Sequence, residues 1–278
     1  MTIDFHFHSN CSDGALSPRA VVARAASHGA TMLALTDHDQ LAGLSEARAA
    51  ADELKVTFIN GVEISVTWCD LTVHIVGLNF DARNAALING LAHMANSRAA
   101  RAQQMSDQLA EVGIHGMYES ALALADGRVD LISRTHFARD LVARKKAANV
   151  RAVFMDYLVA GKPGYVEHTW ASLTDAVDWI VNAGGVAVLA HPGRYMHSEA
   201  DEIELLNDFK HAGGRALEVV TGSHSKKQYK KYAQLAQDFD FLASKGSDFH
   251  AQNESKMDVG KVPVLPQGLT PVESVWLV

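Results

Sequence analysis

Short apolar runs alternate with helical segments along most of the chain, and histidine or carboxylate residues follow several of those runs. Parallel strands that are joined by helices bring their carboxyl ends to one rim of a sheet or barrel. The alternation therefore predicts an α/β fold of about six or seven strands, closed or nearly closed into a barrel. It also predicts that the chemistry lies at the rim where the strands end.

The first of these runs is Ile3-Asp4-Phe5-His6-Phe7-His8, in which apolar and polar residues alternate with the period of a strand. That period places the His6 and His8 side chains on one face, about 7 Å apart along the strand. Two imidazoles in such positions can bind the same metal ion. The polar turn that follows allows Asp13 to fold back beside them.

Later strands are predicted to end in the same kinds of side chain. A hairpin of residues 64–68 and 71–78, turning at Cys69-Asp70, would carry His74 in its second arm. The other predicted strands and their terminal residues are 32–36 before Asp37 and His38, 56–63 ending in Glu63, 186–190 before His191, 216–219 containing Glu218, and 241–244 before Asp248 and His250. Because scattered surface histidines would not recur at strand ends in this way, we expect a metal site there.

Helices are predicted between these strands, and several have recognisable start signals. Ser17 and Ser172 are predicted caps, and Pro18 occupies a first helical position. The predicted helices span about 18–28, 43–54, 173–182, 199–212 and 226–239. Residues 84–160 have helical spacing and almost no strand signal. We therefore predict a barrel of residues 1–99 and 166–278 that is interrupted by a helical insertion subdomain, residues 100–165.

Composition limits the classes of function. With a net charge of −7 the chain has no basic patch of the kind that long nucleic acids require, although bound metal ions could attract a small anion. The two cysteines, Cys11 and Cys69, imply no disulfide framework and fit a cytoplasmic protein. No apolar run is long enough to predict a membrane span, and no leader peptide is expected.

Taken together, the polar positions resemble the motif set of the polymerase-and-histidinol-phosphatase (PHP) family. The matching residues are His6-x-His8, Asp13, Thr36-Asp37-His38-Asp39, Glu63, His74, His191-Pro192 and Ser247-Asp248-x-His250. The resemblance covers residues 1–80 and about 170–255. Within the family, the helical insertion and the segment Arg134-Thr135-His136 are similar to a stand-alone bacterial branch of nucleotide phosphoesterases.

This resemblance implies a distorted (β/α)7 TIM-like barrel that holds two or three divalent metal ions. The implied ligands are His6, His8, Glu63 and Asp248 for the first ion, Glu63, His74 and His191 for the second, and Asp13, His38 and His250 for the third. Imidazole and carboxylate ligands suit manganese, iron or zinc, and manganese is our first expectation. A hydroxide that bridges two such ions would attack phosphorus directly.

Other residues are predicted to act on the substrate. Arg134 and Arg194 could bind a phosphate, since a guanidinium group offers a bidentate fork. Arg194, His136 and His224 are the predicted catalytic residues, although each histidine could equally be a solvated loop residue. The predicted substrate contacts also include Glu218, which could instead orient a ligand, and the loop residues Lys162 and Tyr165. Arg98 and Arg101 are expected on solvated helix faces.

The leading functional hypothesis is removal of the 3'-phosphate from a nucleoside 3',5'-bisphosphate, such as adenosine 3',5'-bisphosphate giving AMP and phosphate. The alternatives within the family are a 5'-to-3' exoribonuclease that acts on short 5'-phosphorylated RNA and a histidinol-phosphate-type phosphatase. An alternative of a different class is a metal-binding module without catalysis. Loss of several ligands would mark such a module, and all the ligand positions are present here. No protein partner is implied.

Overall fold

A computed structural model describes residues 2–195 and 198–276 of the chain. The chain divides into two compact units, Met1–Leu91 with Trp170–Val278, and Ala92–Thr169. The sequence placed the ends of a helical insertion at residues 100 and 165. Whether residues 100–165 fold as a separate subdomain stays a prediction.

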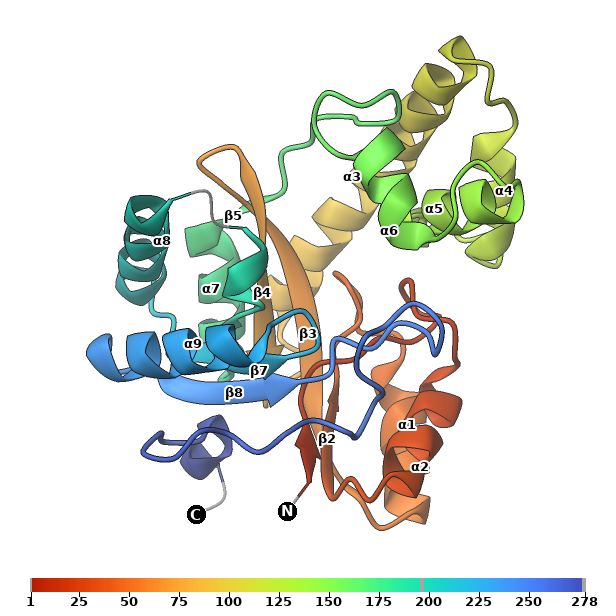
Figure 1. The fold of residues 1–278 in the computed structure, drawn as a ribbon. Coiled ribbons are helices and arrows are strands. Elements are labelled where there is room, and N and C mark those ends of the chain that lie inside the picture. Colours follow the sequence, from red (N-terminus) through yellow and green to blue (C-terminus); the bar gives the residue numbers. More distant parts are fainter. Residues whose placement is uncertain (1, 196–197, 277–278) are drawn as a thin grey trace. The chain divides into compact units, whose positions relative to one another are not determined.

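The first unit is a nearly closed α/β barrel, so the predicted fold class is confirmed (Figure 1). Neighbouring strands follow the order β1-β2-β3-β4-β6-β7-β8, and β4 is antiparallel to both of its neighbours while the other pairs are parallel. The strands are β1 (Ile3–Asp4), β2 (Met32–Leu35), β3 (Thr57–Trp68), β4 (Leu71–Leu78), β6 (Val186–Leu189), β7 (Ala216–Thr221) and β8 (Leu242–Gly246), with the short β5 (Ala171–Ser172) beside β3.

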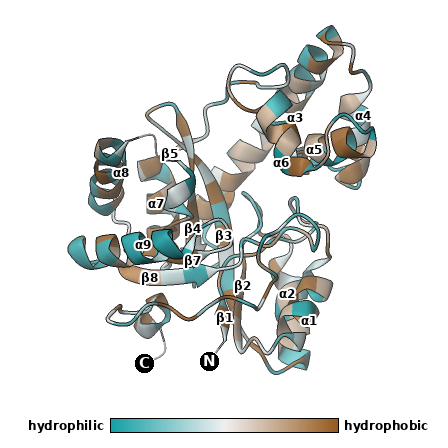
Figure 2. Cartoon of the chain, viewed as in Figure 1, coloured by the Kyte–Doolittle hydropathy of each residue, from teal (hydrophilic) through white to brown (hydrophobic). Residues whose placement is uncertain are grey.

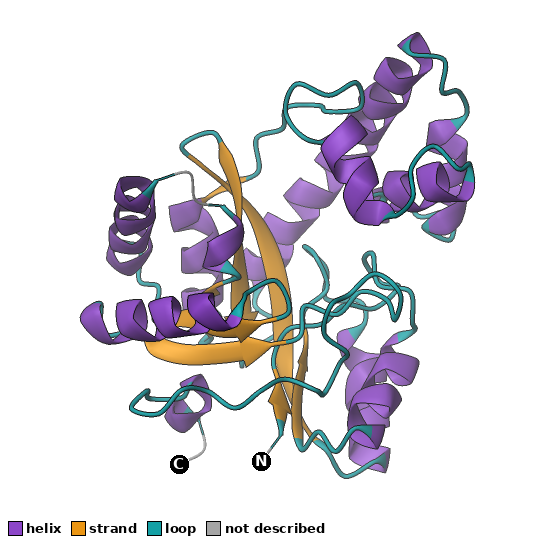
Figure 3. Cartoon of the chain, in the orientation of Figure 1, coloured by secondary structure: helices purple, strands orange, loops and turns teal. Residues whose placement is uncertain are grey.

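Five helices and the 3-10 turn η3 lie between the described strands of this unit, and the 3-10 turn η4 follows the last of them (Figure 3). They are α1 (Pro18–Ser27), α2 (Leu44–Glu53), α7 (Leu173–Asn182), α8 (Glu199–His211), α9 (Lys226–Asp238), η3 (Pro192–Arg194) and η4 (Val272–Val275). The predicted caps are confirmed: the Ser17 side chain accepts from Ala20 N and the Ser172 side chain from Asp175 N. These local signals therefore determined where α1 and α7 begin.

Two strands differ from the sequence-based prediction. The predicted strand 56–63 and the first hairpin arm are one continuous strand, β3, because its pairing with β2 passes directly into its pairing with β4. The turn between β3 and β4 has positive φ at both Cys69 (45°) and Asp70 (63°), as a tight hairpin requires. The first strand is shorter than expected, since β1 ends at Asp4 and the two histidines follow it.

The barrel closes where the segment after β1 meets β8. Phe5 N donates to Lys245 O at 3.1 Å, and Phe7 bridges to Phe249 in parallel orientation. At Gly246 a Cβ atom would lie 2.2 Å from His6 Cβ, so the two segments approach this closely only because the residue is glycine. This closure holds His6 beside the end of β8.

The barrel interior is apolar away from the rim. Residues of β2 and β6 are buried on both faces, as expected for parallel strands covered by helices. Figure 2 gives the hydropathy of each residue along the chain. The buried cluster inside the barrel comprises Ile3, Phe5, Met32, Ala34, Ile59, Val76, Leu78, Val186, Val188, Ala190, Ala216 and Val272. Within the described residues, no helix is long and apolar enough to cross a membrane.

The second unit is helical and has its own core. Its described elements are the later part of α3 (Ala85–Glu111), α4 (Met117–Leu124), η1 (Val129–Leu131), α5 (Arg134–Ala143), α6 (Val150–Val153) and the π-helical turn η2 (Phe154–Leu158). Leu109, Phe137 and Leu141 are fully buried in this core. The expectation that Arg98 lies on a solvated face is wrong, since it is 7% exposed. Burial and the charges of Arg134 and Arg98 lower the pKa of Arg101 to about 9.

Candidate metal centre

The rim of the barrel brings the predicted metal ligands together. Their ligating atoms fall into four groups, within each of which all the atoms lie within 4.8 Å of one another. The groups are His6, His8 and Asp248; His6, Glu63 and His191; His38, Glu63 and His74; and His8, Asp13, His38 and His250. Most of these ligands follow the carboxyl ends of parallel strands, whereas Glu63 lies within β3 and His74 within the antiparallel β4. The cluster therefore joins residues from most of the first unit.

Four atoms near the centre of this cluster form a small ring. Each of the Nε2 atoms of His6 and His8 lies near both Glu63 Oε2 and Asp248 Oδ1: His6 at 3.2 and 3.7 Å, and His8 at 3.3 and 3.5 Å. Two ligands that are each about 2.1 Å from one ion and about 90–110° apart are separated by about 3.0–3.4 Å. The observed ring has nearly that size, so it fits a single ion.

Glu63 joins this ring to the histidines on either side. Its Oε1 atom lies 2.8 Å from both His74 Nδ1 and His191 Nε2, and its Oε2 atom lies 3.1 Å from His38 Nδ1. Burial alone would raise the pKa of the Glu63 carboxyl, but the charges of His6 and His74 and the hydrogen bond from His191 hold it well below its usual range. An ionised carboxylate with two oxygens in different groups can bridge two cations.

A third group lies at the edge of the cluster. Asp13 Oδ1 is 3.4 Å from His250 Nε2 and 3.9 Å from His38 Nε2. The His250 ring packs against the His8 ring with centroids 4.1 Å apart, which connects this group to the central ring of atoms. Burial holds the pKa of His38 well below its usual value, so this imidazole is neutral and has a lone pair available for a metal ion.

Several atoms of the cluster are buried without a hydrogen bond. Among the described residues these include His6 Nε2, both ring nitrogens of His8, His38 Nδ1, Glu63 Oε2 and Asp248 Oδ1. A buried polar atom with no partner costs about 1–3 kcal/mol, so this many in one place is unusual for a folded protein. Divalent cations would provide a partner for these atoms except one nitrogen of His8, because a neutral imidazole has a lone pair on only one of its two nitrogens. The residues present therefore fit the divalent ions that the sequence predicts.

Other carboxylates at the rim hold the loops in place. Asp37 accepts hydrogen bonds from Ser9 N (2.7 Å), Ser9 Oγ (2.6 Å) and Ser12 Oγ (2.6 Å). It thereby fixes the turn that carries Asp13. Asp39 accepts from Ser65 N (2.7 Å) and Oγ (2.9 Å), which fixes β3 two residues after Glu63. These carboxylates are fully used by the protein.

Glu218 lies within β7 and is 2% exposed, directly behind two of the histidines. Its Oε1 accepts from His6 Nδ1 at 3.0 Å, and its Oε2 accepts from His191 N at 2.6 Å. The first bond leaves Nε2 of His6 directed at the cluster. The second holds the backbone of His191, whose φ of 27° is strained for a residue with a side chain. These contacts favour the ligand-orienting role of Glu218 over a substrate contact.

The turn after His191 carries the predicted phosphate-binding arginine. Arg194 has a half-exposed side chain and donates from NH1 to Asp248 Oδ2 at 3.1 Å, the carboxylate oxygen that faces away from the ring of ligands. His224 supports the same turn: its Nε2 accepts from Gly193 N (3.0 Å), and its Nδ1 donates to Val219 O (3.2 Å). Burial lowers the pKa of His224 to about 4. Both ring nitrogens of His224 are therefore hydrogen-bonded to the backbone, which supports this turn, and its predicted catalytic role stays a prediction.

Sequence reasoning did not single out Tyr195. Its hydroxyl lies 2.6 Å from His191 Nδ1 and accepts from His74 N at 3.0 Å, so it contacts two of the predicted ligands. The only signal in the sequence is the position of Tyr195, which is four residues after His191 and next to Arg194 along the chain. That position is not informative without the fold.

The remaining predicted substrate residues belong to the helical unit, which is described by itself. Arg134 is the first residue of α5, and its guanidinium lies 5.6 Å from the centroid of the Phe154 ring. His136 is buried, and its Nδ1 accepts from Ser133 N at 3.0 Å within a capping box. Lys162 is exposed and Tyr165 is half-buried in the loop after η2. Their roles toward the substrate stay predictions.

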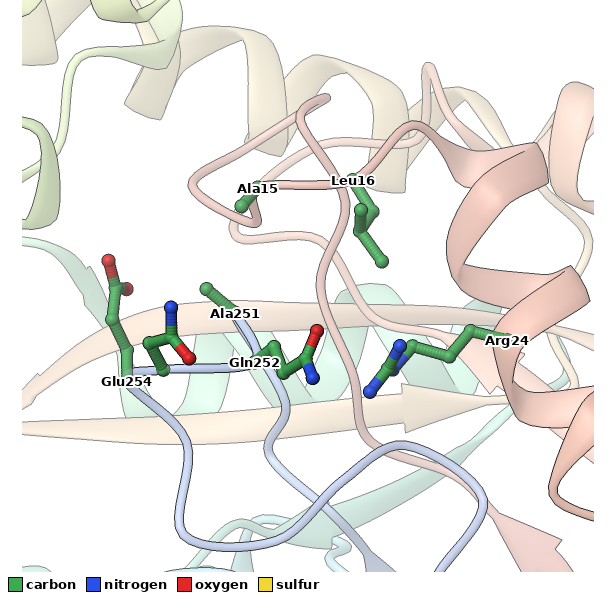
Figure 4. A pocket seen from close by; sticks show the side chains of 7 residues that line it. Ala15, Leu16, Arg24, Ala251, Gln252 and Glu254 are labelled. Atoms are coloured by element: carbon green, nitrogen blue, oxygen red, sulfur yellow. The ribbon is translucent and has the colours of Figure 1, made fainter.

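A cavity of about 290 Å³ lies at the loops after Asp13 and His250, and Figure 4 shows the side chains that line it. It is lined by Ala15, Leu16, Arg24, Ala251, Gln252, Asn253 and Glu254. Two of the lining segments directly follow Asp13 and His250. The Arg24 guanidinium donates to both oxygens of Asp258, at 2.8 and 2.7 Å. None of the predicted ligands lines this cavity, so it is distinct from the space between the ligating atoms.

Comparison with known proteins gives matches over nearly the whole chain. The PHP domain matches residues 4–180. The chain is 50% identical over 270 residues to a 3',5'-nucleoside bisphosphate phosphatase of Chromobacterium violaceum, which covers 97% of this chain and 94% of that protein. It is 42% identical over 247 residues to a 5'-3' exoribonuclease of Haemophilus influenzae, covering 89% of each. A solved amidohydrolase structure from C. violaceum, with bound sulfate and no metal, has a TM-score of 0.96 at 49% identity and covers 99% of this chain and 95% of that one.

Proposed function

The chain belongs to the PHP family, and from this premise we propose that it is a metal-dependent phosphoric monoester hydrolase. Its proposed substrate is a nucleoside 3',5'-bisphosphate, from which it removes the 3'-phosphate. The observation that supports this best is the buried cluster of ligating atoms without hydrogen bonds, in a chain that is 50% identical to a bisphosphate phosphatase. We further propose that the protein acts in the cytoplasm on small phosphorylated nucleotides.

We propose the same ion assignment that the family resemblance implies, with manganese as the resident metal. His6, His8, Glu63 and Asp248 would hold one ion, Glu63, His74 and His191 a second, and Asp13, His38 and His250 a third. When bound, such ions supply positive charge for the phosphate oxygens and lower the pKa of water toward 7. The bridging position of Glu63, with each oxygen facing different histidines, supports ions at neighbouring positions.

The protein's own residues would orient the phosphate and hold the ligands. Arg194 is positioned to direct its other guanidinium nitrogens at a phosphate while NH1 holds Asp248. Glu218 would hold His6 and His191 in place through hydrogen bonds to both. His224 would support the turn that carries Arg194. Arg134 and His136, with Lys162 and Tyr165, are the proposed contacts from the helical unit for the rest of the nucleotide.

A second candidate function is 5'-to-3' exonuclease activity on short RNA with a 5'-phosphate. The 42% identity to an exoribonuclease over 89% of the chain supports this second candidate. Both reactions need attack on phosphorus at the same site. They differ in whether the phosphate that meets the ions is a monoester or a diester.

The test is a comparison of initial rates with manganese added, on three substrates at equal concentration. These are a nucleoside 3',5'-bisphosphate, a nucleoside 5'-monophosphate and a 5'-phosphorylated dinucleotide. We expect the bisphosphate to have the highest kcat/KM, by at least about tenfold. A higher value for the dinucleotide would replace the proposal with the exonuclease.

Two further measurements complete the test. If histidinol phosphate is the best substrate, the protein is a histidinol-phosphate-type phosphatase. Stoichiometric metal with no release of phosphate from any of these esters would indicate a non-catalytic metal-binding module. The Glu63→Gln variant serves as the control for contaminating phosphatases, because it should release no phosphate above background.

A further inference from the structure

The hydroxyl of Tyr195 lies between two candidate ligands that come from different strands. It accepts a hydrogen bond from the backbone N–H of His74 in β4 at 3.0 Å. On its other side it lies 2.6 Å from Nδ1 of His191, which follows β6. The tyrosine ring meets both imidazoles edge-on, with centroids 5.3 Å from His191 and 6.4 Å from His74. The hydroxyl thus connects the two histidines whose rings both contact Glu63.

The direction of the Tyr195–His191 hydrogen bond depends on which nitrogen of His191 carries the proton. A neutral imidazole has one N–H donor and one acceptor nitrogen. If Nε2 carries the proton and donates it to Glu63 Oε1, 2.8 Å away, then Nδ1 accepts from the tyrosine hydroxyl. If Nε2 gives its lone pair to a metal ion, then Nδ1 carries the proton and donates to the tyrosine oxygen.

We propose that Tyr195 is a positioning residue for the metal ion held by Glu63, His74 and His191. Its oxygen accepts from His191 Nδ1 and from His74 N at once, which holds the His191 ring in the tautomer that presents the Nε2 lone pair and ties β4 to the turn after β6. The proposal rests on the proposed function only for the presence of metal. Such partners behind a ligand typically contribute a factor of 10–100 in metal affinity.

A consequence follows for the substrate. A phenol oxygen has two lone pairs and one proton. Once both lone pairs accept from the protein, the O–H group must find a third acceptor. The half-buried Tyr195 ring lies next to Arg194, so a phosphate oxygen bound by Arg194 is the acceptor of the right charge within this part of the site. Metal binding thereby converts the hydroxyl from a donor to His191 into a donor to phosphate, without any change of ionisation.

The experiment compares the parent protein with Tyr195→Phe and with the matched control Tyr229→Phe. Within the part of the chain that the structure describes, the Tyr229 hydroxyl donates to Thr221 O, at 3.4 Å, and has no hydrogen bond to a candidate ligand. Each protein is stripped with a chelator and titrated with Mn²⁺, and bound ions are counted by elemental analysis. We expect one ion of the set to bind about 10–100-fold more weakly in Tyr195→Phe and unchanged binding in Tyr229→Phe. Parent-like binding of every ion by Tyr195→Phe would overturn the proposal.

Two readouts separate positioning from a merely structural effect. At saturating Mn²⁺ the Tyr195→Phe variant should keep kcat within about twofold while its KM for the bisphosphate rises about tenfold, as expected for loss of a hydrogen bond to a charged group. An unchanged KM would remove the donor role toward phosphate. If Tyr195→Phe does not fold, nitrogen NMR of the zinc-loaded parent can show which ring nitrogen of His191 carries the proton. The His191 signal is assigned by comparison with a His191→Gln variant. A proton on Nε2 of His191 contradicts the proposal.

Failure of this inference is distinguishable from failure of the proposed function. The Mn²⁺ titration needs no substrate, so a change in metal affinity would stand even if no phosphate ester were hydrolysed. Conversely, if the protein is an active phosphatase and Tyr195→Phe binds metal like the parent, the proposed function stands and the inference about Tyr195 is wrong.

Discussion

Two sets of buried carboxylates share the rim of the barrel, and they differ in what surrounds them. Asp37 and Glu218 have hydrogen-bond donors from the protein at both oxygens. Glu63 and Asp248 each keep one buried oxygen without a hydrogen bond, facing only imidazole nitrogens. The first set is complete in the folded chain alone. The second is complete only when a cation is added.

This difference separates groups that build the site from groups that act in it. Burying an ionised carboxylate is costly unless hydrogen bonds or opposite charge compensate. For Asp37 the compensation comes from a neighbouring loop, so its contribution is to the fold. For Asp248, burial would raise the pKa, but the nearby imidazoles of His8, His6 and His250 keep it well below its usual range. That carboxylate stays charged and available to a metal ion.

The largest expected effect comes from the incomplete set. His8→Ala should lower kcat/KM by at least about 1,000-fold, because losing metal-ion stabilisation of the transition state forfeits several kcal/mol. Elemental analysis should show less bound metal, while circular dichroism stays that of the parent. His211→Ala, on the exposed end of α8, is the control and should keep full activity. Full metal content and turnover in His8→Ala would erase the distinction between the two sets.

A change in the complete set should act on the fold instead. Asp37→Ala leaves three donors of the turn 9–12 without their acceptor, so we expect the free energy of unfolding to fall by about 3 kcal/mol. Urea unfolding in the presence of a chelator measures this loss without any contribution from metal. The exposed Asp52→Ala should change it by less than about 0.5 kcal/mol. Parent-like stability of Asp37→Ala would show that the hydrogen bonds do not hold the turn.

The smallest effect is expected for Arg194, which belongs to neither set of carboxylates and donates to the outer oxygen of Asp248. Arg194→Ala should raise KM for the phosphate substrate about tenfold, since one charge-assisted hydrogen bond contributes about 1.5–3 kcal/mol. Bound metal should stay unchanged, because Arg194 donates to the outer oxygen of Asp248 and not to the oxygen in the ring of ligands. The exposed Arg215→Ala is the matched control. Equal kinetics for Arg194→Ala and the parent would remove Arg194 from substrate binding.

Local sequence signals were sufficient for the elements and for the kinds of residue at the rim. The caps at Ser17 and Ser172 and the alternation of strands and helices depend on neighbours within a few residues. The sequence could not show that β3 is one strand, because its ends pair with different partners. It also could not show that Arg98 is buried, since helical spacing alone does not say which face is covered.

The sequence by itself therefore determined the barrel class, the positions of the candidate ligands along the chain and the family resemblance. Only the tertiary structure decided which polar atoms have protein partners and which do not. The reason is distance along the chain: His6 and Glu218 are 212 residues apart, and Glu63 and His191 are 128 apart. Contacts of that kind, including the position of Tyr195 behind His191, exist only once the barrel closes and leave no periodic pattern in the sequence.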